Sequence, residues 1–377
     1  MHETAPMRRS THSPIRPRVA LARDGLARAR RAAMACCIGL LALSAAPAHG
    51  ASTLLNETGS TLIYPLFQRW SVAYATVAPG VTVTAAATGS GAGIAAALSG
   101  RARIGASDAY MSDQQVEQNR GILNIPLAIS AQTVNYNIPG LSGSPLRLDG
   151  PTLAGIYSGK ITVWDAAPIV ALNPGVRLPH RQIVPIRRAD DSGDTFIFTQ
   201  FLDFSTQSWE DQIGYGTSVA WPAVAGELTA MGNEGMVHKA AATAYSLAYI
   251  GISLHQAIAQ AGLGTASLEN QSGKFVLPTA ETISTAASKL DPRTPPDERL
   301  SLVFAPGDQS YPLVNYEYVV VSTRQPNPET AESLRRFLLW TLATDGGGAG
   351  KYLDAVGFIP LPDFIRALSE NQIDLIK

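Results

Sequence analysis

Four short clusters of Gly, Ser, Thr and Asp carry groups that could bind an anion. In chain order they are residues 59–62 (GSTL), 89–91 (GSG), 105–108 (GASD) and 192–194 (SGD). Hydroxyls and the free N–H groups at a helix start donate hydrogen bonds, and glycine lets a ligand approach the backbone closely. Each cluster alone could be an ordinary helix cap. Together they predict a site that surrounds an oxyanion with donors.

Two arginines stand just before the last cluster, in the stretch RRADDSGDTFIF over 187–198. Neighbouring residues of a strand point to opposite faces, so only one of Arg187 and Arg188 can face a site. A guanidinium can bind an oxyanion through two parallel hydrogen bonds. The alternative is a surface ion pair with Asp190 or Asp191, and alternation alone does not decide between them.

Two acidic residues belong to these clusters. An ionised carboxylate can only accept hydrogen bonds, so Asp108 in an anion site requires a ligand that carries a proton. Phosphate at neutral pH does and sulfate does not, so Asp108 would select between them. The alternative is a helix cap or an arginine partner. For Asp194, in the first turn of the predicted helix, we expect either acceptance of a second ligand proton or a pair with Arg188.

Residues able to support catalysis are few. Ser90 lacks an identifiable base, and Thr88 stands where a nucleophile-elbow motif needs glycine. His180, His238 and His255 lie in no recognisable metal-binding spacing. The phosphate-loop lysine motif and the dinucleotide glycine motif are both absent from the sequence. We therefore expect no enzymatic activity, no metal and no cofactor.

The clusters lie where predicted strands give way to predicted helices. From Leu62 to Tyr74 apolar residues recur every four positions, which predicts a helix with Pro65 in its first turn. Ser112 and Gln115 have the spacing of a capping box. Further predicted segments are a strand over 81–89, a helix over 94–100, and a strand, turn and helix over 103–119.

The same alternation continues through the rest of the chain. It predicts a strand over 128–140, two short helices within 148–175, a strand and helix over 182–202, and a strand near 244–253. A proline-rich surface loop is predicted over 289–301, a strand over 311–322, and an amphipathic helix over 328–343 with Leu334, Phe337, Leu338 and Leu342 on one face. This pattern is typical of α/β proteins, whose ligands bind at the carboxyl ends of strands.

We expect two α/β lobes around a central cleft, with the chain crossing between them near 128–135 and near 306–315. Lobe I would comprise residues 49–130 and 311–377, and lobe II residues 131–310. Residues 1–48 are predicted to be a secretory signal peptide. They contain eight arginines, an apolar run from Ala32 to Ala46 and a small-residue cleavage pattern ending at Ala48. An uncleaved anchor is the alternative.

Removal of residues 1–48 changes the chemistry of the chain. The segment holds both cysteines, Cys36 and Cys37, so the exported chain can form no disulfide. It also holds eight of the 29 basic residues and two of the 30 acidic ones, which leaves a net charge of −7. An acidic exported protein is a poor candidate for binding nucleic acid or an anionic membrane.

The chain resembles the PstS family, the phosphate-binding proteins of ABC-type phosphate importers. The resemblance covers essentially the whole exported chain, and it rests on an ordered set of short motifs. These are NETGSTLIYPLF at 56–67, TGSGAG at 88–93, IGASDAYMSD at 104–113, the segment 148–179, RRADDSGDTFIFTQFL at 187–202, AYSLAYIGIS at 244–253 and YPLVNYEYVVV at 311–321.

The resemblance implies a periplasmic-binding-protein type II clamp with two crossover hinge strands. It also implies the phosphate ligands, carried over motif by motif: Ser60, Thr61, Leu62, Ser90, Asp108, Arg188, Ser192, Gly193 and Asp194. Many members of the family have threonine where this chain has Asp194, so the hydroxyl donor is lost there while the backbone N–H remains. A subset of the family carries aspartate.

The function implied is capture of inorganic phosphate in the periplasm and its delivery to the membrane permease subunits of an ABC importer. We expect a monomer without a cofactor and without nucleic-acid partners. Two alternatives from other classes are a secreted phosphatase-like hydrolase and a surface interaction protein that keeps the clamp.

Overall fold

The computed structural model of the chain describes residues 52–141 and 145–377, so the predicted signal peptide lies outside the described residues. The strands are β1 Thr53–Gly59, β2 Val81–Thr84, β3 Ile104–Ser107, β4 Ile122–Tyr136, β5 Arg147–Leu148, β6 Val184–Arg188, β7 Leu228–Ala230, β8 Ser246–Gly251, β9 Gly264–Thr265, β10 Ser267–Glu269, β11 Phe275–Val276 and β12 Val314–Ser322.

The helices confirm the predicted alternation with strands. They are α1 Tyr64–Val77, α2 Ser90–Leu98, α3 Asp113–Gln118, α4 Gly150–Tyr157, α5 Ala167–Leu172, α6 Gly193–Ser205, α7 Gln207–Glu210, α8 Gly232–Ala242, α9 His255–Gln260, α10 Ala280–Leu290, α11 Pro328–Leu342, α12 Gly350–Leu353 and α13 Asp363–Ile373. Short 3₁₀ turns are η1 Ile252–Leu254, η2 Asp291–Arg293 and η3 Asp354–Val356.

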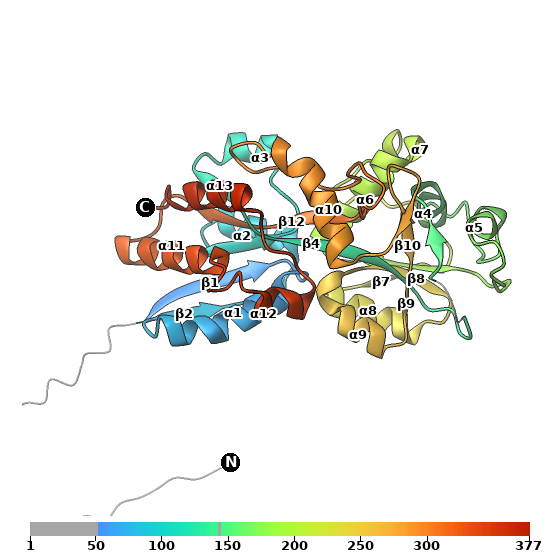
Figure 1. Cartoon of the computed structure of the whole chain (residues 1–377), viewed down its shortest axis with the longest axis horizontal. Helices are drawn as coiled ribbons and strands as arrows, with labels where there is room; N and C mark the ends of the chain where they lie inside the picture. Colours follow the sequence, from blue (N-terminus) through green and yellow to red (C-terminus); the bar gives the residue numbers. More distant parts are fainter. Residues whose placement is uncertain (1–51, 142–144) are drawn as a thin grey trace, which may run out of the picture. The chain divides into compact units, whose positions relative to one another are not determined.

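Strand β4 joins two groups of strands in one sheet, whose order is β2-β1-β3-β12-β4-β8-β6-β7, with β9 also pairing β4. The first part of β4, Ile122–Ala131, pairs antiparallel with β12, and its last part, Gln132–Tyr136, pairs antiparallel with β8. In Figure 1, β4 runs from the group with β1, β2 and β3 to the group with β7 and β8. Strand β12 lies between β3 and β4, and every residue of it except Ser322 is buried.

Helix α1 forms as its four-residue repeat predicts. Pro65 occupies its first turn, where a missing N–H costs nothing. Its buried side chains are Leu66, Phe67, Trp70 and Tyr74. Phe337 of α11 packs against this face, with ring centroids 6.2 Å from Phe67 and 5.0 Å from Tyr74. The predicted apolar face of α11 and the Ser112–Gln115 capping box are confirmed as well.

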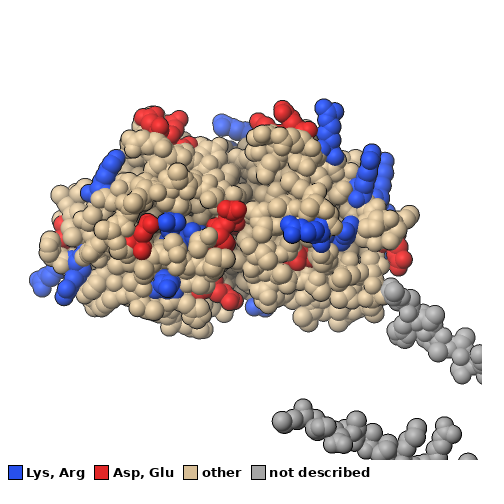
Figure 2. Space-filling view, turned by 180° about the vertical axis from the view of Figure 1, so that it is seen from behind, with Lys and Arg blue, Asp and Glu red and all other residues tan. Residues whose placement is uncertain are grey.

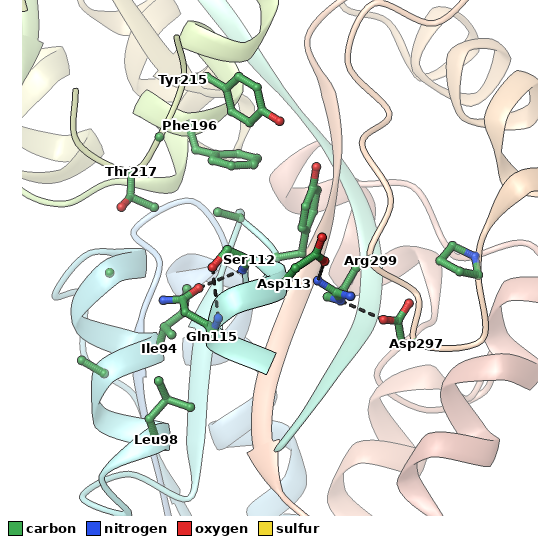
Figure 3. Close-up of a pocket in the computed structure, with 16 residues that line it drawn as sticks. Ile94, Leu98, Ser112, Asp113, Gln115, Phe196, Tyr215, Thr217, Asp297 and Arg299 are labelled. Carbon is green, nitrogen blue, oxygen red and sulfur yellow. Dashed lines mark hydrogen bonds and ion pairs between the residues drawn. The ribbon is translucent and has the colours of Figure 1, made fainter. Parts of the chain in front are cut away.

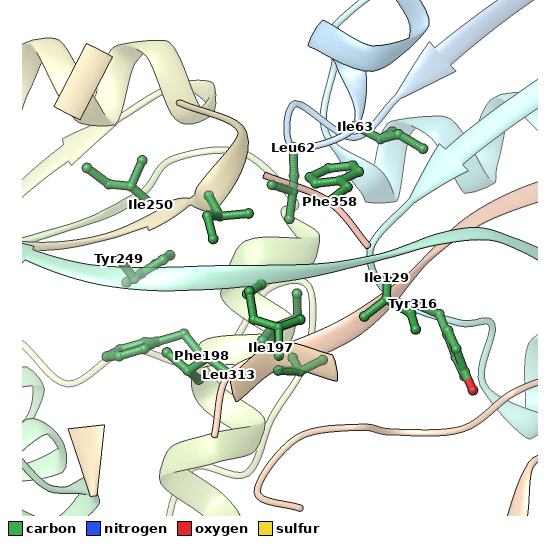
Figure 4. Packing of buried hydrophobic residues seen from close by; sticks show 14 of the residues in the cluster. Leu62, Ile63, Ile129, Ile197, Phe198, Tyr249, Ile250, Leu313, Tyr316 and Phe358 are labelled. Atoms are coloured by element: carbon green, nitrogen blue, oxygen red, sulfur yellow. The ribbon is translucent and has the colours of Figure 1, made fainter. Parts of the chain in front are cut away.

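A hydrophobic core is formed where the start of α6, the end of β8 and the residues that follow β1 pack together. Figure 4 shows Ile197 and Phe198 of α6 near Tyr249 and Ile250 of β8, with Leu62 close by. The rings of Phe198 and Tyr249 stack with centroids 4.5 Å apart. Each large apolar side chain buried in this way stabilises the fold by about 1.5–3 kcal/mol. The loops at the strand ends are therefore held on a rigid base.

The predicted surface loop over 289–301 is wrong in part. Asp291 and Glu298 are buried, although proline and charge dominate this stretch. The Tyr316 hydroxyl donates to Asp291 at 2.6 Å, and Ser369 of α13 donates to Glu298 at 2.9 Å. Polar partners from distant segments make burial of these carboxyls possible.

Charged side chains on the face seen in Figure 2 are scattered, singly and in small groups, over a mostly uncharged surface. Several charged side chains of the protein are paired, as Arg299 is with Asp113 at 2.7 Å. Within the two described stretches, no helix combines the length and the apolar character needed to cross a bilayer.

Candidate functional site

All four sequence clusters come together at the ends of strands and the starts of helices. β1 ends at Gly59 and β3 ends at Ser107, while α2 begins at Ser90 and α6 at Gly193. Side-chain hydrogen bonds join the clusters: Ser60 and Ser90 both bond to Asp108, and Asn233 bonds to both Thr61 and Asp194. The predicted convergence of donors and acids is thus present in the fold.

Asp108 is the acid at the middle of this cluster, and only 2% of its surface is exposed. The Ser60 hydroxyl donates to its Oδ1, and the Ser90 hydroxyl donates to its Oδ2 at 3.3 Å. Its backbone N–H donates to Ser90 Oγ at 3.2 Å. Burial, followed by the nearby charges of Glu317 and Asp194, raises the pKa of Asp108 well above its ordinary value.

The start of α6 lies against Asp108. Ser192 is the N-cap residue, and its hydroxyl accepts from the Thr195 N–H at 3.4 Å. Gly193 follows, and a Cβ at this position would lie 2.5 Å from Ser90 Oγ and 2.6 Å from the Asp108 Cβ. Only glycine lets the positive end of the helix dipole come this close to the carboxyl.

Arg188 faces the cluster and Arg187 faces away from it. Arg188 is 3% exposed, and its guanidinium donates to both carboxylate oxygens of Asp190 and to Oδ2 of Asp194. Arg187 instead pairs with Glu227 at 2.9 Å. The structure therefore answers the question that strand alternation left open. Asp190 orients the arginine, and the pKa of its carboxyl is lowered although burial acts in the opposite direction, because Arg188 stabilises the ionised form.

Asp194 is fully buried and paired with Arg188, one of its two predicted roles. Its Oδ2 also accepts from Asn233 Nδ2 at 2.7 Å, and its Oδ1 accepts from Gln132 Nε2 at 3.1 Å. Asn233 in turn donates from its backbone and side chain to Thr61 Oγ1, at 3.1 and 2.9 Å. These bonds connect the first cluster to the last one.

The first cluster differs from its predicted use in one respect. The Ser60 N–H donates to the Ala106 carbonyl at 2.9 Å, and the Leu62 N–H donates to Ser60 Oγ at 3.0 Å. Two of the backbone donors expected for a ligand are thus engaged within the protein. They close the turn that leads into α1, a bonding pattern that serine hydroxyls favour.

Three residues of this cluster were not predicted from the sequence: Gln132, Asn233 and Glu317. The available signal for Gln132 and Glu317 was that each is a polar residue within a stretch that is otherwise mostly apolar and predicted to be a strand. Glu317 is fully buried, and the antiparallel register of β12 with β3 places it beside Asp108. Among the described residues, no group of His, Cys, Asp and Glu is arranged to hold a metal ion.

Two cavities border the cluster. One cavity, of about 810 Å³, is lined in part by Gly91 and Ala109, which are the sequence neighbours of Ser90 and Asp108. Figure 3 shows Phe196 and Tyr215 along one side of it and Arg299 bonded to Asp113 and Asp297 on another. The second, of about 680 Å³, has Thr61, Asp190 and Asn233 in its wall. The buried cluster therefore lies next to two cavities.

Comparison with known proteins identifies relatives along almost the whole chain. A family model described as the PBP superfamily domain matches residues 46–345. The phosphate-binding protein PstS of Methanocaldococcus jannaschii is 32% identical over 342 residues, which cover 86% of each chain. The phosphate-binding protein PstS of Xylella fastidiosa is 30% identical over 311 residues, which cover 82% of each chain.

Solved structures share the fold. A high-affinity periplasmic phosphate-binding protein, PfluDING, bound with phosphate, superposes with a TM-score of 0.65 at 23% identity, over 83% of this chain and 92% of that one. A putative phosphate ABC transporter substrate-binding protein from Clostridium perfringens, with bound phosphate, has a TM-score of 0.59 at 17% identity. That match covers 82% of this chain and 100% of the other.

Proposed function

We propose, on the premise that the chain belongs to the PBP superfamily and to its PstS phosphate-binding proteins, that it captures inorganic phosphate for an ABC-type importer. Its fold is the α/β clamp of the type II periplasmic binding proteins. The protein would be exported into the periplasm, act as a monomer, and hand phosphate to the permease subunits without catalysis.

The observation that carries this proposal is the convergence of donors and acids from both groups of strands. Thr61, Ser90 and Asp108 approach from the side of β1 and β3, and Arg188 with the start of α6 approaches from the side of β6. An anion held by both sides would draw them together through a hinge in β4. The proposed phosphate ligands are Ser60, Thr61, Leu62, Ser90, Asp108, Arg188, Ser192, Gly193 and Asp194.

Protons would distinguish phosphate from sulfate in this site. Asp108 offers a buried acceptor that sulfate cannot satisfy, because sulfate carries no proton at neutral pH. We propose that Asp194, besides its pair with Arg188, accepts a second proton from phosphate. In that case affinity rises as the pH falls toward about 6, where phosphate gains this proton. An Asp194→Asn variant whose affinity depends on pH as strongly as the wild type's would contradict this role.

Calorimetry with phosphate, sulfate, arsenate and phosphite tests the function directly. The exported chain should bind phosphate, and Arg188→Ala should weaken binding by at least about 100-fold, because a buried charge-assisted contact is lost. Arg187→Ala is the matched control and should keep full affinity, since Arg187 pairs with Glu227. Absence of phosphate binding in the wild type, or release of phosphate from a chromogenic ester, would overturn the proposal.

A further inference from the structure

Glu317 lies in the middle of β12, at the point where its register with β4 shifts between Glu317 and Tyr318. Its side chain is fully buried. One oxygen, Oε1, accepts hydrogen bonds from the Ser130 hydroxyl and from Asn315 Nδ2, the latter at 2.9 Å. The other, Oε2, is buried without a donor partner among the described residues. The carboxyl is therefore fixed in place, with one oxygen free to share a proton.

That proton has a clear partner, because β12 pairs antiparallel with β3 with Tyr318 opposite Ser107, a register that places Glu317 beside the buried Asp108. Two buried carboxylates side by side repel each other unless one of them is protonated. One shared proton would remove this repulsion and give the free oxygen of Glu317 a hydrogen-bonding role. Such a pair titrates as a unit, not as two separate residues.

The charges around the pair favour keeping this proton. The charged group that faces it is Asp194 at the start of α6, which is paired with Arg188 at the end of β6; Arg188 is also paired with Asp190. Arg188 is already bonded to both of these aspartates, so the pair has no cation of its own. Burial raises the pKa of Asp108 and raises that of Glu317 to about 7.

We propose that Glu317 is a specificity-determining residue that forms with Asp108 a carboxyl pair, which holds one proton in the site and binds it more tightly when an anion enters. The proposal rests on the function proposed above, since it assumes that the cluster binds a tetrahedral oxyanion. An anion adds negative charge beside the pair, which makes loss of the shared proton less favourable. Binding is therefore coupled to proton uptake by the protein.

The coupling has a defined sign. Below the pH at which the free pair loses its proton, binding needs no uptake and the pair contributes no pH dependence. Above that pH the proton must be taken up on binding, so affinity falls by up to tenfold per pH unit. This fall adds to the titration of phosphate itself. The pair would thus make capture weaken at alkaline pH more steeply than the ligand alone requires.

The test compares the wild type with Glu317→Gln. The amide of glutamine can donate to Asp108 and accept from Ser130 and Asn315, but it does not titrate. Phosphate affinity is measured by calorimetry between about pH 6 and 9, in buffers of different ionisation enthalpy, which also gives the number of protons taken up. The titration of free phosphate is the same in both experiments, so it cancels in the ratio of the two affinities. The pH dependence of that ratio therefore reports the titration of the carboxyl pair alone. We expect the ratio to change by up to tenfold per unit above about pH 7.

Glu298→Gln is the matched control. Glu298 is also a fully buried carboxyl, but its side chain bonds to Ser369 and Gln372 of α13 and not to the cluster. It should follow the wild-type pH profile of affinity. Parallel profiles for wild type and Glu317→Gln would overturn the inference, and absence of phosphate binding in the wild type would overturn the proposed function instead.

A second measurement needs only the wild type, and so does not depend on the folding of a variant. At about pH 8, the protons taken up on binding should exceed those that phosphate gains through its own titration. Proton uptake that the titration of phosphate fully accounts for would also contradict the proposed carboxyl pair.

Discussion

Gly193 shows how closely the site is built at the level of single atoms. A Cβ at this position would come within 2.6 Å of the Asp108 Cβ, closer than real atoms allow. Either the start of α6 or the loop of Asp108 must then move. Gly193→Ala should weaken phosphate binding by at least about 100-fold, because misplaced donors lose most of their hydrogen-bond energy.

Gly80→Ala is the control for that substitution, since a Cβ at Gly80 would meet no atom within 4 Å. Titration calorimetry measures affinity for both variants, and thermal unfolding shows whether each is folded. A folded Gly193→Ala protein with unchanged affinity would mean that the contact between α6 and Asp108 does not position phosphate.

Asp108 should also govern the choice between anions. Asp108→Asn replaces an acceptor by a group that can donate through its amide, so an unprotonated anion no longer meets a carboxylate. We expect sulfate to compete with phosphate at least about tenfold better than in the wild type, because repulsion between like charges in a buried site costs several kcal/mol. Asp191→Asn, an exposed neighbour of the cluster, should leave sulfate exclusion intact. Equal competition in both variants would remove Asp108 from the selection.

At the scale of elements, the loop over 289–301 is fastened to α13 by Glu298. Ser369 donates to Glu298 Oε1 at 2.9 Å and also to the Pro126 carbonyl at 3.1 Å, so its hydroxyl can instead accept from a protonated Glu298. Gln372 donates to Oε2 of the same carboxyl. The neutral carboxylic acid thus satisfies every partner around it. Burial raises the pKa of Glu298 to about 8.

Stability should therefore fall as the pH rises. A carboxyl with a raised pKa in the folded protein holds its proton there after the unfolded chain has lost it. Its contribution to the free energy of unfolding is therefore complete below its ordinary pKa and is lost as the pH rises to about 8. Glu298→Gln should remove roughly 4 kcal/mol of the decrease in unfolding free energy between about pH 5 and pH 9. Urea unfolding at several pH values measures it. An unchanged pH dependence would exclude Glu298 as its source.

The order of strands and helices was predictable because period and turn chemistry are local properties of a sequence. The four clusters were predictable for the same reason. The partners were not: Gln132 donates to Asp194, 62 residues away, and Ser130 donates to Glu317, 187 residues away. Contacts of this kind depend on which strands become neighbours in the sheet. The buried Glu298 was missed because proline and charge usually mark exposed loops.

At the scale of the whole molecule, charge works against the proposed ligand. Without residues 1–48, the predicted signal peptide, the chain carries a net charge of −7. Asp113 and Asp297 outnumber Arg299 in the wall of the larger cavity, and Asp190 and Glu234 lie in the wall of the other. A phosphate ion approaching either opening therefore meets repulsion, and only the buried dipoles and Arg188 attract it at short range.

Salt should accordingly speed up association. Stopped-flow tryptophan fluorescence should show the on-rate for phosphate rising severalfold between low salt and about 0.5 M sodium chloride, because ions screen the long-range repulsion. The off-rate should change little, since the bound ion is shielded from solvent. An on-rate that falls with salt would show that the local field at the opening is attractive despite the net charge.

The contacts of Asp194 bear on how the protein can change over evolutionary time. Arg188, Asn233 and Gln132 all donate to this one carboxyl. Threonine at the same position would leave these donors short of acceptors, at a cost of about 1–3 kcal/mol for each buried group. Threonine there is thus accessible only to a lineage that also remodels its partners. Residues 132 and 194, on two different elements, should be inherited together as one unit in the descendants of this chain.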